Sequence, residues 1–103
     1  MIHVIGTVEL HPGTRDKFLV EFFRLKPEVL GEEGCIEYGA AVDLISGLGA
    51  QPPLRPDAVT IVEKWASLAA LKSHLTAPHM GSYRDRVRSF VVKATIQVFE
   101  PVD

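Results

Sequence analysis

Apolar and polar side chains alternate along four segments of the chain, which predicts four β-strands. These segments are residues 2–10, 35–44, 58–65 and 91–100. Residues 15–30 and 67–87 instead repeat apolar side chains at three- and four-residue spacing, which is typical of helices that bury one face. Pro78 divides the second helical region, because proline is tolerated as a first helical residue but not in a helix interior. The predicted order is βαββαβ.

This order predicts an α+β protein of the ferredoxin-like type, with a four-stranded antiparallel sheet and its helices on one face. Residues 1–103 are expected to form a single domain, because 103 residues is an ordinary length for one domain. The other sheet face has no helix to cover it. The apolar rows of the second and third strands are too hydrophobic to face water opposite the helices, so we expect a homodimer that buries sheet faces or edges.

Several local features of the first half can be predicted. Thr14 is the expected N-cap of the first helix, and Pro27 is expected to kink or restart that helix because proline removes a backbone hydrogen bond. The core-facing stripe of this helix is predicted to comprise Phe18, Leu19, Phe22, Phe23, Leu25, Val29 and Leu30. The second strand is predicted to place on one side Ile36, Tyr38, Ala40 and Val42.

Residues 45–57 carry two glycines and three prolines, a composition typical of a loop. Hairpin loops usually have about two to five residues, and longer loops in compact domains are often functional. Two interpretations remain open: a lid over a pocket, or an extended hairpin without a role.

Composition and charge exclude several classes of partner. The net charge of -2 and the pI of about 6.1 provide no basic surface for nucleic acid or an anionic membrane. No apolar run approaches the roughly 20 residues of a membrane span, and the first ten residues do not have the pattern of a signal peptide. Cys35 is the only cysteine, which excludes an intrachain disulfide. We therefore expect a soluble, cytoplasmic protein.

The candidate chemistry lies in residues 58–87, which hold the only tryptophan and two of the four histidines. Glu63 shares one strand face with Val59, Ile61 and Trp65, because every second strand residue points the same way. A carboxylate in such a row lies at the mouth of a pocket or pairs with a cation, since an unpaired buried charge is too costly. His74 is expected at the edge of the apolar stripe of the following helix, partly buried. That helix is predicted to begin after Ser67 as N-cap and to carry a stripe of Leu68, Leu71 and Leu75.

A set of short motifs covers nearly the whole chain and points to one family. The set comprises Glu32-Glu33-Gly34-Cys35-x-x-Tyr38, Val42-Asp43, Pro56-Asp57, Glu63-x-Trp65-x-Ser67, His74-Leu75-x-x-Pro78-His79-Met80 and Tyr83. It resembles the antibiotic biosynthesis monooxygenase superfamily of dimeric α+β barrels, and within it the small bacterial quinol monooxygenases. The resemblance implies that each subunit of a homodimer oxidises a quinol or similar small aromatic with O₂, in a pocket between sheet and helices, without metal or other cofactor.

The resemblance also implies roles for six residues. His74 is the expected base, because imidazole titrates near neutral pH, and Glu63 is its expected catalytic partner. Substrate binding is expected from Trp65, as an aromatic wall, and from Tyr38, His79 and Tyr83. Structural alternatives stay open for these side chains: core packing, a hydrogen-bonded histidine at a helix edge, or a salt bridge from Glu63 to Arg or Lys.

Other functions fit the same fold. The anthrone-oxidising branch has an amide and a tyrosine where this chain has Ile61 and Leu71, and the asparagine of the haem-degrading branch is missing at Gly6 and Thr7. Two further alternatives are a non-catalytic dimer that binds a small ligand or takes part in a stress response, and an isomerase or decarboxylase of a small polar metabolite.

Overall fold

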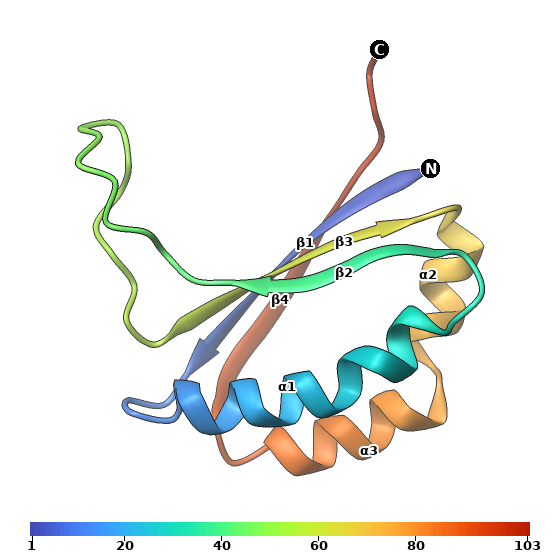
Figure 1. Ribbon diagram of the computed structural model, residues 1–103, viewed down its shortest axis with the longest axis horizontal. Helices are drawn as coiled ribbons and strands as arrows, with labels where there is room; N and C mark the ends of the chain where they lie inside the picture. Colours follow the sequence, from blue (N-terminus) through green and yellow to red (C-terminus); the bar gives the residue numbers. More distant parts are fainter.

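The computed structural model describes residues 1–103 and has the predicted order of elements. The elements are β1 (Ile2–Leu10), α1 (Arg15–Leu30), β2 (Cys35–Ala41), β3 (Ala58–Trp65), α2 (Leu68–Leu75), α3 (Pro78–Val87) and β4 (Val91–Phe99). The strands form one antiparallel sheet in the order β2-β3-β1-β4. All three helices lie on one side of this sheet (Figure 1). The ferredoxin-like α+β fold is therefore confirmed.

The hydrophobic core lies between the sheet and its three helices, with the largest helical share from α1. Strand β3 is central and alternates as predicted, so that Val59, Ile61, Glu63 and Trp65 are all buried. They face the apolar side chains that α1 buries, namely Phe18, Phe22, Leu25 and Val29. The β3 row thus faces the helices and is not part of the uncovered sheet face.

Strand β2 differs from its prediction because it contains a bulge. Cys35 pairs with Trp65 and Glu37 with Lys64, so Ile36 is an extra residue between two steps of the ladder. The bulge turns Ile36 outward, where it is 55% exposed, while Tyr38 is 5% exposed. Ile36 and Tyr38 therefore do not share a face. The strand also ends at Ala41, three residues earlier than predicted.

Helix α1 also departs from the prediction in three details. Thr14 occupies the N-cap position, but its hydroxyl donates to the carbonyl of His11 and does not cap the helix. The helix continues through Pro27, so the predicted restart is wrong, whereas the alternative, a kink, stays a prediction. The carbonyl that loses its partner belongs to Phe23, whose side chain is 59% exposed, so water can satisfy it. Phe23 and Leu30 lie on the outer surface and not in the core.

The predicted boundaries of the second helical region are confirmed. Ser67 is the N-cap of α2 and accepts a hydrogen bond from the backbone N–H of Ala70 at 3.1 Å. Pro78 opens α3, as expected from its missing N–H. Leu71 is buried against the sheet, whereas Leu68 lies at the exposed start of α2. The apolar stripe of α2 is therefore narrower than predicted.

Residues 42–57 leave the sheet and form an arm beyond its end, on the side away from α2 (Figure 1). The base of the arm is tied by Asp43, whose two carboxylate oxygens accept from the guanidinium of Arg55 at 2.8 and 2.9 Å.

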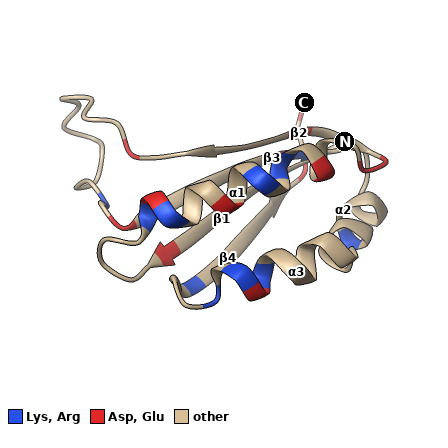
Figure 2. Cartoon of the chain, turned by 60° about the horizontal axis from the view of Figure 1, so that its bottom comes forward, with Lys and Arg blue, Asp and Glu red and all other residues tan.

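The surface divides into a charged helical side and an apolar strand. Basic and acidic residues alternate along α1 and α3 (Figure 2). Strand β4 forms one edge of the sheet and exposes large hydrophobic side chains, namely Val92, Ile96, Val98 and Phe99. None of the helices has the length and hydrophobicity needed to cross a membrane.

Candidate functional site

A cavity of about 450 Å³ lies between the sheet and α3. Most of its lining is apolar, contributed by the four strands and by all three helices. Polar side chains reach it from several elements: Tyr38, Glu63, His74, Tyr83, Arg84, Arg88 and Thr95. An apolar cavity with a few convergent polar groups is the usual form of a small-molecule site. No residue of the arm 42–57 lines it, so the arm is not a lid in this conformation.

Glu63 reaches the cavity from the middle of the sheet. Its carboxylate oxygen Oε1 accepts a hydrogen bond of 2.9 Å from the indole Nε1–H of Trp65. Burial raises the pKa of Glu63 above its usual value, while the indole hydrogen bond and the nearby His74 partly oppose that rise. The partner of Glu63 is thus an indole and not the Arg or Lys of the structural alternative.

His74 is more deeply buried than its place in the sequence suggested. It is 1% exposed, because α2 lays it directly over the β2–β3 end of the sheet. Its ring centroid lies 4.7 Å from that of Trp65 and 5.4 Å from that of Tyr38. Nδ1 of His74 lies 2.9 Å from Oε2 of Glu32, which leaves Nε2 as the ring atom without a protein partner.

Glu32 was given no role by the sequence analysis, yet it contacts both histidines of the candidate site. The same oxygen, Oε2, lies 2.7 Å from Nε2 of His79. Glu32 follows the end of α1 and is 42 and 47 positions away from the two histidines. A residue in a loop belongs to no helical or strand repeat from which the direction of its side chain could be predicted. Its inclusion in the run from Glu32 to Tyr38 was the one available signal.

Two tyrosines of the predicted site line the cavity. Tyr38 stacks on Phe22 with ring centroids 5.3 Å apart, and Tyr83 packs edge-to-face on Phe18 at 6.1 Å. Burial is the main reason why the pKa of each phenol lies above its usual value. Both phenols therefore stay protonated and are able to donate a hydrogen bond to a ligand. Their binding roles remain predictions.

Trp65 and His79 are near the cavity without lining it. Trp65 is fully buried behind His74, where it supports both the imidazole and the carboxylate of Glu63. His79, in the first turn of α3, points to Glu32. Four of the six predicted residues thus share one cavity. Trp65 contacts two of its lining residues, Glu63 and His74, whereas His79 is linked to His74 only through Glu32.

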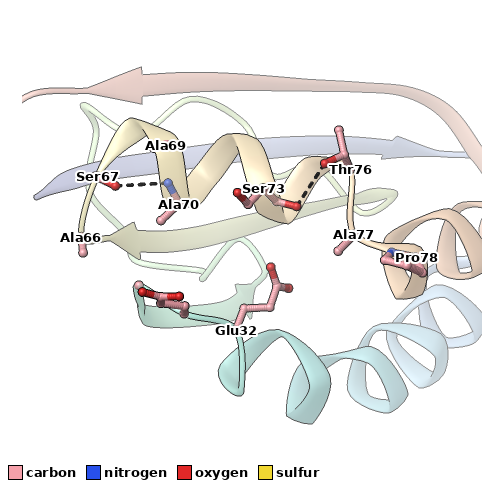
Figure 3. Close-up of a pocket in the computed structure, with 11 residues that line it drawn as sticks. Glu32, Ala66, Ser67, Ala69, Ala70, Ser73, Thr76, Ala77 and Pro78 are labelled. Carbon is pink, nitrogen blue, oxygen red and sulfur yellow. Dashed lines mark hydrogen bonds between the residues drawn. The ribbon is translucent and has the colours of Figure 1, made fainter.

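A second, larger depression of about 720 Å³ lies on the other side of Glu32, between the α1–β2 connection and α2. Figure 3 shows the Glu32 side chain reaching into this groove below Ser73 and Ala77. The groove is lined largely by short alanine and serine side chains, which offer a ligand little to hold. We therefore take the 450 Å³ cavity as the candidate site.

Two further features of the site concern its chemistry. Burial, together with Glu32 and Glu63, raises the pKa of the Cys35 thiol, so this half-buried cysteine is a weak nucleophile. No three side chains among His, Cys, Asp and Glu are grouped so that they could hold a metal ion.

Comparison with known proteins agrees with this geometry. The sequence profile of the antibiotic biosynthesis monooxygenase family matches residues 1–86. The "Probable quinol monooxygenase YgiN" of Escherichia coli strain K12 is 36% identical over an alignment of 103 positions, which covers 98% of this chain and 98% of YgiN.

Solved structures share the fold. A conserved protein from Methanosarcina mazei Go1 superposes with a TM-score of 0.80 at 24% identity, over 96% of this chain and 90% of its own. Rv0793 from Mycobacterium tuberculosis superposes with a TM-score of 0.79 at 20% identity, over 99% and 95% of the two chains. The profile match and the identity to YgiN together establish that this chain belongs to the antibiotic biosynthesis monooxygenase family.

Proposed function

We propose that the protein is a cofactor-independent monooxygenase that oxidises a quinol, or a similar electron-rich aromatic, with O₂. The observation that carries this proposal is a buried imidazole, His74, which lines an apolar cavity next to the carboxyl group of Glu63. The cavity volume of about 450 Å³ suits a one- or two-ring aromatic. The similarity to YgiN supports a quinol as the substrate class.

The first chemical step in this proposal is proton transfer. Nε2 of His74 takes a proton from a quinol hydroxyl, and the resulting anion is electron-rich enough to pass one electron to O₂. The apolar lining keeps water away from both reactants. A carboxyl with a raised pKa, such as Glu63, holds its proton to higher pH than an exposed glutamate does, which suits it to protonate the departing oxygen.

The overall reaction balances with the quinol as the electron source. A quinol with a free ring C–H and one O₂ give a hydroxyquinone and one water. The substrate loses four electrons, one oxygen atom forms the new C–O bond, and the other leaves as water. A simple oxidase would instead give the quinone and hydrogen peroxide, with no oxygen atom in the product.

The test is oxygen uptake by chelator-treated protein with menadiol, corrected for autoxidation without protein. His74→Gln is preferable to His74→Ala, because truncating a fully buried ring would also open a void. We expect His74→Gln to lower kcat about 100-fold, since a general base contributes roughly 10²–10⁴. His11→Gln, at an exposed histidine outside the site, is the matched control and should behave as wild type.

Labelled oxygen completes this experiment. Incorporation of one ¹⁸O atom per product molecule supports a monooxygenase. An unlabelled quinone, formed together with hydrogen peroxide, would show that the protein is an oxidase and would contradict the monooxygenase proposal. Uptake equal to autoxidation in wild type and variant alike would contradict the proposal for menadiol-like quinols. A protein that only binds such ligands would then be the better interpretation.

We propose further that the protein acts as a homodimer and, because its single cysteine suits a reducing compartment, in the cytoplasm. The support for the dimer is the exposed apolar edge strand β4, which includes Val92 and Val98. Val98→Asp should shift the mass measured by light scattering from two chains toward one. Val20→Asp, at a similarly exposed valine on α1, is the control and should leave the mass unchanged. A wild-type mass of one chain would refute the dimer.

A further inference from the structure

A single carboxylate oxygen lies between the two imidazoles of the site. Oε2 of Glu32 is 2.9 Å from Nδ1 of His74 and 2.7 Å from Nε2 of His79. Side-chain exposure rises along this series, from 2% for His74 to 14% for Glu32 and 22% for His79. The series therefore runs from the buried cavity to the surface.

The carboxylate of Glu32 determines which ring nitrogen of His74 carries the proton. An ionised carboxylate only accepts hydrogen bonds, so Nδ1 of His74 must be the protonated nitrogen of the neutral ring. Nε2 is then unprotonated. The ring does not turn over easily, because it packs against the rings of Trp65 and Tyr38.

Nε2 is also the atom that a ligand reaches. It makes no hydrogen bond within the protein, and no buried side-chain nitrogen or oxygen lacks a partner, so Nε2 is accessible from the cavity that His74 lines. The arrangement thus presents a bare imidazole nitrogen to whatever occupies the cavity.

We propose that Glu32 is a positioning residue that holds His74 in the tautomer with Nε2 free toward the cavity. This inference rests on the proposed function in so far as His74 serves as the base. The tautomer itself is independent of any activity.

The electrostatic surroundings of His74 come from every element packed against it. Glu63 on β3 and Glu32 are carboxyl groups, and Arg84 on α3 brings positive charge at the cavity wall. Tyr38 on β2 and Tyr83 on α3 are neutral phenols, and the Cys35 thiol on β2 is neutral too. Among these groups only Glu32 makes a hydrogen bond to the imidazole of His74.

The consequence for the site follows from the hydrogen bond between Glu32 and Nδ1 of His74. Loss of the carboxylate removes the group that keeps Nδ1 protonated, so part of the His74 population would lose its bare Nε2 and turnover would fall.

The first test reads the tautomer directly by ¹⁵N NMR of the histidine side chains, assigned with His74→Gln. In wild type we expect His74 to be protonated at Nδ1 and bare at Nε2. Glu32→Gln should give a mixture of tautomers, because an amide can both donate and accept. Glu33→Gln, the same change at the exposed neighbour, should leave the wild-type spectrum. A His74 protonated at Nε2 in wild type, or unchanged in Glu32→Gln, would overturn the inference.

The second test measures menadiol oxidation. Glu32→Gln should lower kcat about tenfold or more with KM within about twofold, because the variant changes the tautomer of the base and leaves the cavity intact, and Glu33→Gln should behave as wild type. A wild-type kcat in Glu32→Gln would refute the positioning role of Glu32. If wild type shows no turnover, the proposed function fails, while the NMR result still decides the role of Glu32.

Discussion

The hydrogen bond between Trp65 and Glu63 allows a quantitative prediction. Trp65 is fully buried, and its Nε1–H is the one protein donor to the Glu63 carboxylate. Trp65→Ala would cost about 3–5 kcal/mol, a large share of the roughly 5–15 kcal/mol that stabilises a domain of this size. Trp65→Phe is the better perturbation, because it keeps an aromatic ring while removing the N–H.

The expected cost of Trp65→Phe comes mainly from the lost hydrogen bond. A hydrogen bond to a charged group contributes about 1.5–3 kcal/mol, and the smaller ring leaves some unfilled space. Without substrate, the cavity next to Glu63 has room for water, which would replace part of the lost bond. We therefore expect a loss of about 2 kcal/mol in the free energy of unfolding, which lowers Tm by roughly 8–16 °C.

The pH dependence separates the hydrogen bond from packing. Burial raises the pKa of Glu63, and the indole opposes that rise, so Trp65→Phe should raise the pKa further. A carboxyl with a raised folded-state pKa favours folding below its unfolded pKa and loses that contribution as pH rises through the folded value. The cost of Trp65→Phe should therefore be larger at pH 7 than at pH 4.

The assay is urea denaturation followed by far-UV circular dichroism at one fixed protein concentration. Phe23→Leu, at an exposed aromatic residue of α1, is the control and should change stability by less than about 0.5 kcal/mol. A Trp65→Phe cost below about 0.5 kcal/mol at pH 7, or an equal cost at pH 4 and pH 7, would refute the reasoning.

Three further predictions can be tested by urea denaturation or by NMR. Glu63→Gln keeps an acceptor for the indole and removes a buried charge, so it should raise the urea midpoint at pH 7 and flatten its pH dependence; a lower midpoint would contradict this. Gly34→Ala should cost more than Gly13→Ala, because both have positive φ but only at Gly34 would a Cβ approach another side chain, at 2.6 Å; equal costs would contradict the contact. Arg55→Ala should return the pKa of Asp43 from about 2 toward 3.8, measured by carboxyl titration in NMR, and an unchanged value would exclude Arg55 as the cause.

The sequence predicted those parts of the fold that depend on local patterns. The alternation of β3, the serine cap of α2 and the proline start of α3 each follow from the residue and its neighbours. The bulge at Ile36 could not be predicted, because it depends on how β2 aligns with a strand more than twenty residues away. The exposure of Phe23 has a similar cause, since the helices leave one side of α1 uncovered.

The candidate site was likewise predicted only where local sequence patterns determine the position of a side chain. The alternation of β3 placed Glu63 and Trp65 on one face, and the structure adds the hydrogen bond between them. The depth of His74 was underestimated, because a helical period gives the direction of a side chain but not the thickness of what packs over it. Glu32 was missed, since its contacts depend on where a loop crosses α2.

The close approach of the α1–β2 connection to α2 depends on Gly34. Its φ is +83°, a conformation that side chains with a Cβ rarely adopt, and a Cβ there would lie 2.6 Å from the Cβ of Ala70 on α2. The missing side chain lets the α1–β2 connection lie directly against α2, and the backbone N–H of Ala66 donates to the carbonyl of Gly34 at 2.8 Å. Glu32, two residues earlier, is thereby held within hydrogen-bond distance of His74. A residue that looks purely structural thus sets the position of the carboxylate, so Gly34→Ala should disturb the tautomer of His74 as well as the stability of the fold.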